Sequence, residues 1–525
     1  MHMFTTRRKQ DMRSRKWFVG KIRFKNLFID ISDFPMMIVE VATTFCLVWF
    51  VWYLVTTYFE RRLMPPGPFP YPLIGNLQHL NSNSSKPFRK LRETYGDIFS
   101  VTLGGTSVIV NTASLAREVR LGRNKDYAVN VLSESVYPFN IILGPNDVIF
   151  ASYGTPYLFR KRVFKSAMHV FGAGINDAEE RGGHAVKSML EKIDSMKGQP
   201  FSPKELIESA ILIQLWQWLT SEKVSFEHTN IKLLLEFSEI IAKQNVEGTY
   251  FHKLPFHSYL PTEFNRSIKR ATDIKSSIMP QTFQSHLETY TPGVIRDMID
   301  SFISAYKKET AKETSKDIGS IDDIRDMMID VTFAGSDTTS STLAWFILYM
   351  VSYPEVQKKI HDELDQVIGK DDLPRWQDVK NMPYLQATIC EVMRKSSPVP
   401  ITGSNTIRAI TVAGYRIPKG TSVVLNLTQI HQDEQEWPEP EEFKPERFRD
   451  VEGKFVGWTK LDAFLPFGLG RRECAGIAFA KIMLFTFAAT LLHRLRRFQG
   501  CSEKPTLKTH LDFGLKDHKI EYAMQ

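Results

Sequence analysis

Residues 464–476 read FLPFGLGRRECAG, and this segment constrains the rest of the chain more than any other. It places one cysteine, Cys474, in a glycine-rich loop beside two adjacent arginines. Glycine residues permit sharp turns and allow the backbone to approach a flat ligand closely. The apolar run from Ala475 to Leu492 predicts a helix, and its first amides would favour a thiolate at Cys474.

A lone cysteine is most often a buried structural thiol, and this interpretation applies to Cys474 when it is considered by itself. The loop, however, also fixes Phe467, Gly470, Arg472 and Gly476 at set spacings from the cysteine. Average residue usage makes such a combination rare by chance. A thiolate in a loop of this kind is a good axial ligand for haem iron. Arg472 is suited to pair with a carboxylate such as a haem propionate.

The pattern F-x-x-G-x-R-x-C-x-G resembles the fingerprint of the cytochrome P-450 superfamily, the haem-thiolate monooxygenases. The resemblance extends over roughly residues 65–525, and its details are similar to the animal microsomal drug- and steroid-oxidising group. It implies the cytochrome P-450 fold, which is mainly α with small β-sheets. It also implies haem b, iron protoporphyrin IX, with Cys474 as the metal ligand. Phe467, Gly470, Arg472 and Gly476 are then assigned to cofactor binding.

A second motif lies in a helical pattern that runs from Ser320 to Ser352, far longer than an average helix. Ser320 and Asp323 predict a capping-box-like start. The middle of the pattern reads AGSDTT, and its glycine and consecutive threonines predict a local distortion. The resemblance places this segment over the haem and assigns Asp337 and Thr338 to proton delivery. A helical threonine commonly bonds its own backbone instead, and this alternative stays open.

A third motif combines Glu391 and Arg394, on a helix predicted from Pro383 to Lys395, with Arg447 farther along the chain. Glutamate and arginine at this spacing share one helix face and commonly form a surface ion pair. The resemblance instead implies a buried structural triad that includes Arg447. Loss of one member would leave an unpaired buried charge, which is strongly destabilising.

The resemblance also places a tryptophan and, four residues later, an arginine against a haem propionate. This chain has Tyr157 and Lys161 at those positions. Both side chains donate hydrogen bonds, but lysine lacks the bidentate fork of arginine. A solvated basic face is the alternative, and Arg160, Arg162 and Lys165 on the same segment would then face an acidic electron donor.

The propionate region of many relatives includes a histidine or arginine where this chain has Ser404. Arg408 is the candidate substitute, and an ordinary surface arginine is the alternative. We therefore include Arg408 among the predicted cofactor-binding residues, together with Tyr157 and Lys161.

The composition limits the class of protein. The chain has 525 residues, 43% of them hydrophobic, which is enough for a sizeable core, and its formal net charge is +8. Positive charge favours anionic partners such as a membrane surface, an acidic protein or nucleic acid. Of these we expect the membrane and an acidic protein, and no nucleic acid. The four cysteines show no paired spacing, so neither a disulfide framework nor a zinc signature is visible.

The N-terminal region predicts three segments before the catalytic domain. Residues 1–35 form a basic arm with nine Lys or Arg against three Asp. Residues 36–60 form a transmembrane signal anchor, because the uncharged stretch 41–59 reaches about 28 Å as a helix. Residues 61–76 form a proline-rich hinge that disfavours helix. Residues 77–525 form the haem-thiolate catalytic domain.

Two indications conflict on the location of the catalytic domain. The positive-inside rule places the basic arm in the cytosol and the catalytic domain in the lumen. The resemblance implies a single-pass protein of the endoplasmic reticulum membrane whose catalytic domain is cytosolic, where its reductase resides. An arginine-rich mitochondrial presequence is a further alternative. We follow the resemblance.

The implied activity is the insertion of one oxygen atom of O2 into a lipophilic substrate. Electrons would come from NADPH through a separate NADPH-cytochrome P-450 reductase. Steroids, sterols, fatty acids and xenobiotics all fit an apolar pocket, so the sequence does not distinguish them. The alternatives are a haem-thiolate isomerase or dehydratase, which needs no electrons, and a non-enzymatic membrane haem protein. Asp337 and Thr338 favour the monooxygenase, because proton delivery matters when oxygen is reduced.

Overall fold

The structure is a computed structural model. It describes residues 34–79, 86–102, 105–122, 128–131, 142, 146–173, 175–197, 203–242, 260–313, 318–369, 372–495, 498–500 and 522–524. Nearly all of the predicted basic arm, residues 1–33, lies outside the described residues.

The chain divides into two compact units, residues 1–62 and residues 63–525. The first unit contains helix α1 (Phe34–Arg61), whose stretch Met37–Arg61 is apolar and long enough to be a candidate membrane span. Helix α16 (Ile477–Arg494) passes the same test of length and composition. Because 67% of α16 is buried inside the second unit, it is a core helix of that unit.

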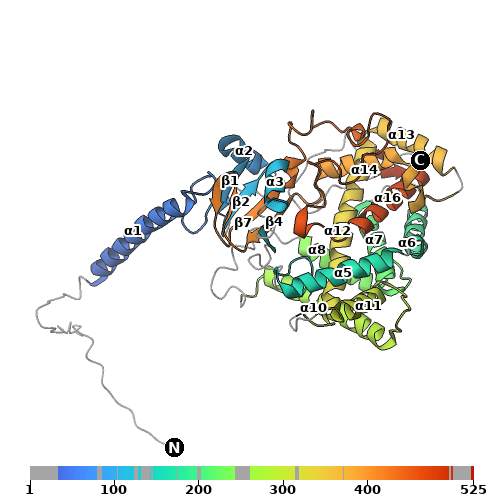
Figure 1. The fold of residues 1–525 in the computed structure, drawn as a ribbon, viewed down its shortest axis with the longest axis horizontal. Helices are drawn as coiled ribbons and strands as arrows, with labels where there is room; N and C mark the ends of the chain where they lie inside the picture. Colours follow the sequence, from blue (N-terminus) through green and yellow to red (C-terminus); the bar gives the residue numbers. More distant parts are fainter. Residues whose placement is uncertain are drawn as a thin grey trace, which may run out of the picture. The chain divides into compact units, whose positions relative to one another are not determined.

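The second unit is mainly helical with small sheets, as predicted (Figure 1). Its other helices are α2 (Lys86–Tyr95), α3 (Ala113–Arg120), α5 (Thr155–Ala173), α6 (Ile175–Ser195), α7 (Pro203–Thr220), α8 (Thr229–Ala242), α10 (Glu263–Thr289), α11 (Met298–Thr310), α12 (Asp323–Ser352), α13 (Pro354–Val367), α14 (Pro383–Ser396) and α15 (Leu427–Ile430). Short 3-10 helices are η2 (Leu77–His79), η5 (Trp376–Asn381), η6 (Pro445–Phe448) and η7 (Gly470–Arg472).

Helix α12 is the central element of this unit, and it packs against α7, α10, α14 and α16 (Figure 1). Its 30 residues correspond to a length of about 45 Å. Every residue from 339 to 350 is buried, so this half of the helix is enclosed on all faces. A helix enclosed in this way has no need of a polar stripe, which explains its largely apolar second half.

The predicted start of α12 at Ser320 is wrong, because the helix begins at Asp323. The Ser320 hydroxyl accepts from the Asp322 amide at 3.2 Å, so it closes a turn before the helix. The Asp323 carboxylate forms a buried ion pair with Arg160 at 3.0 Å. It also accepts a hydrogen bond from the Ser320 backbone amide, so one of the two hydrogen bonds of the predicted capping box is present. The predicted distortion is also not found, since the helix continues through residues 334–339 without a break.

The main sheet has five strands in the order β1-β2-β7-β4-β3. The strands are β1 (Ile98–Thr102), β2 (Thr106–Val110), β3 (Ala128–Val131), β4 (Ile401–Thr406) and β7 (Ser422–Asn426). Only β2 and β7 pair in parallel, and the other neighbours are antiparallel. Two further pairs are β5 (Ile410–Val412) with β6 (Tyr415–Ile417), and β8 (Phe498–Gly500) with β9 (Tyr522–Met524).

The proline-rich segment is bound to the edge of this sheet. The carbonyl oxygens of Pro65 and Pro66 accept hydrogen bonds from the Ser100 hydroxyl and amide, each at 2.8 Å. The Asn76 side chain accepts from the Thr102 amide at 2.8 Å. Extended backbone with unused carbonyls is suited to this role, since proline itself supplies no donor. Residues 63–76 therefore belong to the second unit.

The predicted triad of Glu391, Arg394 and Arg447 is confirmed. Arg394 donates to both carboxylate oxygens of Glu391, at 2.7 and 2.8 Å, and both side chains are fully buried. The Arg447 Nε atom lies 3.6 Å from the same carboxylate. Arg394 also donates to the carbonyl oxygens of His431 and Pro440 at 2.8 and 2.9 Å. The triad thus holds the segment that contains His431 and Pro440, which is distant in sequence from Arg394.

Glu391→Gln keeps the shape of the side chain but removes the charge that balances the buried Arg394. We expect the free energy of unfolding, measured by denaturant titration, to fall by about 3–5 kcal/mol. Asp362→Asn is the matched control, because Asp362 pairs with Lys358 at the surface, and it should cost less than about 0.5 kcal/mol. Equal, small losses in the two variants would contradict this assignment.

Candidate active site

The cysteine loop is closed by two backbone hydrogen bonds. The Gly468 amide donates to the Leu465 carbonyl, and the Cys474 amide donates to the Phe467 carbonyl, both at 3.0 Å. Gly468 and Gly470 have φ angles of 66° and 77°, a region that residues with a side chain rarely adopt. A Cβ atom on Gly470 would also lie 2.6 Å from the Arg120 carbonyl oxygen. Both glycines are therefore required by the loop.

Cys474 lies just before α16, and Gly476 is the N-cap residue of this helix. The Gly476 amide donates to the Cys474 sulfur and lowers the thiol pKa, as the sequence predicted. Burial has the larger effect, however, and the net result is a raised pKa of Cys474. The helix alone therefore does not stabilise the predicted thiolate, and a cationic partner is needed as well. A metal ion supplies this positive charge when it binds the sulfur.

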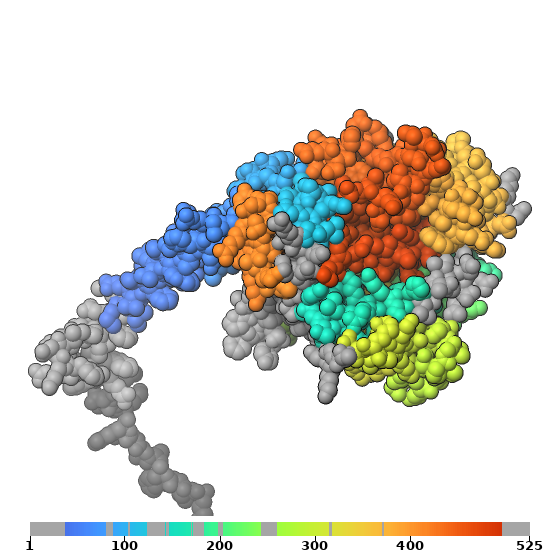
Figure 2. Space-filling model, in the orientation of Figure 1, coloured from blue at the N-terminus to red at the C-terminus, as the bar shows by residue number. Residues whose placement is uncertain are grey.

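The Cys474 side chain keeps accessible surface even though protein atoms surround it on most sides. The segment that contains it lies beside α5 (teal in Figure 2), in the orange-red region that leads to α16. A sulfur atom that is accessible yet enclosed is suited to a bound group, and it is unlike the fully buried Cys390.

Arg472 and Tyr157 meet beside the loop. The Arg472 guanidinium carbon lies 3.8 Å from the centre of the buried Tyr157 ring, and its Nη2 atom donates to the Ala151 carbonyl at 2.8 Å. The Lys161 amine donates to the Arg471 carbonyl. Burial, with repulsion from Lys165 and Arg472, lowers the pKa of Lys161 to about 8. The structure therefore brings these predicted residues together.

Arg120, the last residue of α3, is a site residue that the sequence patterns did not predict. Arg120 is buried and donates from Nη1 to the Ser404 hydroxyl at 2.9 Å. Burial, followed by repulsion from Arg472, lowers the pKa of Arg120 to about 10. The helical spacing of Ala113, Ala116 and Arg120 along the buried face of α3 is the sequence signal that reveals it.

Arg120 and Arg472 concentrate positive charge at the cysteine loop. Two arginines that repel each other in a buried region favour an anionic ligand between them. Haem carries two propionate carboxylates, and arginine forms the strongest hydrogen bonds to carboxylates. The sulfur of Cys474 and this pair of cations therefore fit the haem group that the sequence predicts.

The face of α12 with residues Val331, Ala334 and Thr338 is only partly buried, unlike the enclosed second half of this helix. These three residues are spaced so that they share one helix face. The Thr338 hydroxyl donates to the Ala334 carbonyl at 2.7 Å, which is the backbone alternative left open by the sequence. Its oxygen lone pairs can still accept a hydrogen bond.

Gly335 has a packing role in place of the predicted distortion. A Cβ atom at this position would lie 3.1 Å from a methyl group of Leu215 in α7. The glycine therefore permits the close approach of α7 to α12, which is a common use of glycine between packed elements.

A cluster of polar side chains lies where α7, α8 and α12 meet. Burial raises the pKa of Asp337 in α12, against an opposing effect of Lys204. Burial and the nearby Asp337 carboxylate raise the pKa of Glu208 in α7 to about 7, and Glu208 is hydrogen-bonded to Ser238 of α8. The sequence analysis missed Glu208, because only the packed helices bring it near Asp337.

Two predicted features of the basic surface change in the structure. Arg160 is buried in its ion pair with Asp323, so it is not part of a solvated basic face, although Arg162 and Lys165 are exposed. Arg162 in turn pairs with Glu313. Arg408 is exposed on the turn between β4 and β5, so its assignment to cofactor binding stays a prediction.

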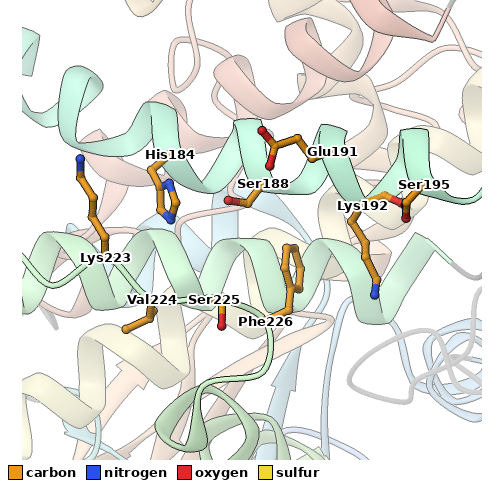
Figure 3. A pocket seen from close by; sticks show the side chains of 9 residues that line it. All are labelled: His184, Ser188, Glu191, Lys192, Ser195, Lys223, Val224, Ser225 and Phe226. Carbon is orange, nitrogen blue, oxygen red and sulfur yellow. The ribbon is translucent and has the colours of Figure 1, made fainter.

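A surface groove lies between α6 and the segment that follows α7 (Figure 3). Exposed or half-exposed polar side chains such as His184, Glu191 and Lys223 line it, and none of the predicted site residues does. The groove is therefore separate from the candidate active site.

The comparisons with known proteins show the family of this chain. The sequence pattern of the cytochrome P450 family matches residues 65–524. The steroid 17-alpha-hydroxylase/17,20 lyase of Ictalurus punctatus is 31% identical over 436 residues, which cover 82% of this chain and 84% of that protein. Cytochrome P450 2E1 of Sus scrofa is 31% identical over 460 residues, covering 86% and 91%. Cytochrome P450 2D6 of Homo sapiens is 31% identical over 440 residues, covering 82% and 86%. The chain therefore belongs to the cytochrome P450 family of haem monooxygenases.

Proposed function

We propose that this protein is a microsomal monooxygenase that inserts one atom of O2 into a lipophilic substrate, with NADPH electrons delivered by a separate NADPH-cytochrome P-450 reductase. The observation that carries the proposal is the exposed Cys474 just before α16, beside the buried Arg120 and the half-buried Arg472. Haem ligated by a thiolate supplies the chemistry that favours cleavage of the O–O bond.

The residues around the cysteine loop have distinct roles in this proposal. Cys474 would hold the haem iron through its sulfur, and the Gly476 amide would stabilise the negative charge of the thiolate. Arg120 and Arg472 would bind the haem propionates, and the Tyr157 ring contacts the Arg472 guanidinium. Because these arginines repel each other, a bound dianionic group also relieves an unfavourable interaction in the protein.

The residues on α12 supply protons. The Thr338 hydroxyl donates to the Ala334 carbonyl, and its oxygen lone pairs would accept a hydrogen bond from a water molecule. The raised pKa of Asp337 allows its carboxyl group to hold a proton one position earlier on the helix. Glu208, with a pKa of about 7, is poised to exchange protons with Asp337 near neutral pH.

The substrate is proposed to be lipophilic. Val331 and Ala334 contribute accessible apolar surface on the same face of α12 as Thr338. Two of the similar proteins are named for steroid hydroxylation and lyase activity, which involves a largely apolar molecule. Apolar surface with few polar groups selects for such ligands.

We further propose that α1 anchors the protein in the endoplasmic reticulum membrane as a single span, with the catalytic unit in the cytosol. The uncharged stretch within Met37–Arg61 supports the anchor. The basic arm favours the opposite orientation by charge alone. The cytosolic location of a microsomal reductase supports the orientation that we propose.

The first test is reconstitution of the purified haem-loaded protein with purified reductase. We expect NADPH consumption that rises on addition of a turnover substrate, and a strongly red-shifted absorption band when the reduced protein binds carbon monoxide. Cys474→Ala should lose both the band and product formation. Turnover of a peroxide substrate without NADPH would instead indicate an isomerase, and haem binding without any turnover would indicate a carrier.

Thr338→Ala removes the hydroxyl that receives the water hydrogen bond. We expect haem binding and NADPH consumption to persist. Product per NADPH should fall by about tenfold or more and hydrogen peroxide should rise, because no hydroxyl positions the water that delivers the proton. Thr338→Ser keeps the hydroxyl and should behave like the wild type. If Thr338 only bonds its own helix, stability will change and the ratio of product to NADPH will not.

Deletion of residues 1–62 removes the first unit and leaves the second unit complete. We expect the truncated protein to shift from the membrane fraction toward the soluble fraction, since α16 is largely buried and offers no second span. Protection of an N-terminal tag from protease in intact microsomes would support a cytosolic catalytic unit. Digestion of the tag would show that charge determines the orientation.

A further inference from the structure

His431 joins the end of α14 to the cysteine loop. It is 1% exposed and follows α15 directly. Its Nδ1 atom lies 3.0 Å from the Ser397 hydroxyl, and its Nε2 atom lies 3.0 Å from the Leu465 amide nitrogen. Its ring packs against Phe464 with 5.7 Å between ring centres. Three segments that are far apart in sequence therefore meet at one imidazole.

The hydrogen-bond partners define the tautomer of this ring. A backbone amide only donates, so the Leu465 N–H requires an unprotonated Nε2 atom. The neutral ring must then carry its hydrogen on Nδ1 and donate to the Ser397 oxygen. Burial and the nearby Arg394 charge lower the pKa of His431 to about 3, so the ring stays neutral near physiological pH.

The contact with Leu465 reaches Cys474 through a short series of backbone bonds. The Leu465 carbonyl accepts from the Gly468 amide, and the Phe467 carbonyl accepts from the Cys474 amide. The first bond closes the turn that presents Phe467, and the second holds the cysteine backbone against this residue. The Leu465 amide thus fixes the beginning of the turn on which the position of the sulfur depends.

The backbone of His431 is bound to the triad. The His431 carbonyl accepts from Nη1 of Arg394 at 2.8 Å, and Arg394, like Glu391, is a fully buried member of the triad. Arg394 thus holds the backbone of His431, while Ser397 and Leu465 hold its ring. His431 therefore connects the triad to the cysteine loop, so the fixed position of Arg394 also limits where the loop can lie.

We propose that His431 is a positioning residue for the haem thiolate: its neutral ring holds the Leu465 amide and thereby sets where the Cys474 sulfur lies. The proposal rests on the proposed function of Cys474 as the iron ligand. It predicts that loss of the acceptor at Nε2 loosens the loop and weakens the iron–thiolate bond, even where the fold survives.

The test compares His431→Leu, His431→Gln and His431→Asn in the full-length haem-loaded protein. Leucine removes the acceptor, glutamine places an amide oxygen near the Nε2 position, and asparagine reaches only the Nδ1 position. We expect amide hydrogen exchange of residues 464–470 in His431→Leu to become about tenfold faster, as a lost hydrogen bond implies. The carbon monoxide band should shift in part to that of a haem without its thiolate, and glutamine should restore both properties better than asparagine.

Ile360→Val is the control for general destabilisation, because Ile360 is a fully buried residue of α13. It should lower the melting temperature without changing exchange at residues 464–470 or the carbon monoxide band. Unchanged exchange and an unchanged band in His431→Leu would overturn the proposal. If His431→Leu does not fold, identical behaviour of the glutamine and asparagine variants would overturn it instead. A wild-type protein without the thiolate band would contradict the function of Cys474 and not the role of His431.

Discussion

The buried ion pair between Glu391 and Arg394 is the interaction on which the region of the cysteine loop depends. Residues 431–476 contain only two short 3-10 helices and one isolated strand bridge, so regular secondary structure does not hold this segment in place. A fully buried guanidinium must use its donors, and Arg394 directs them to Glu391 and to carbonyl groups of this segment. The path of the chain before Cys474 is thus fixed by satisfying one buried charge.

The candidate site combines this fixed loop with two other properties of the fold. Arg120 from α3 and Arg472 from the loop converge from distant parts of the chain, and their mutual repulsion makes the region receptive to an anionic group. On α12, Thr338 shares a partly accessible face with apolar residues, while Asp337 lies near Glu208 at the junction with α7. In the proposed site, the cysteine loop supplies the ligand and one anion-binding arginine, α3 supplies the other arginine, and α12 and α7 supply protons.

Local sequence patterns predicted the elements but not the contacts between them. The proline-initiated α14 begins at Pro383 as predicted, and Glu391 and Arg394 share a helix face because of spacing alone. Arg120 and Ser404 are 284 residues apart in sequence, and Arg160 and Asp323 are 163 apart, so neither contact has a local signal. The same limit applies to Gly335, whose role depends on Leu215 of another helix. The helix through 334–339 stays regular, and the hydroxyl groups of Ser336, Thr338 and Ser340 donate to carbonyls of the same helix.

The central claim is that the accessible sulfur of Cys474 is the protein ligand of a haem iron. X-ray absorption at the iron K-edge of the purified haem-loaded protein measures this directly, because sulfur and nitrogen differ as scatterers of the photoelectron. The account predicts one sulfur atom in the first coordination shell of the wild-type protein and its loss in Cys474→Ser. A wild-type first shell made only of nitrogen and oxygen atoms, or a sulfur atom that persists in Cys474→Ser, would contradict it.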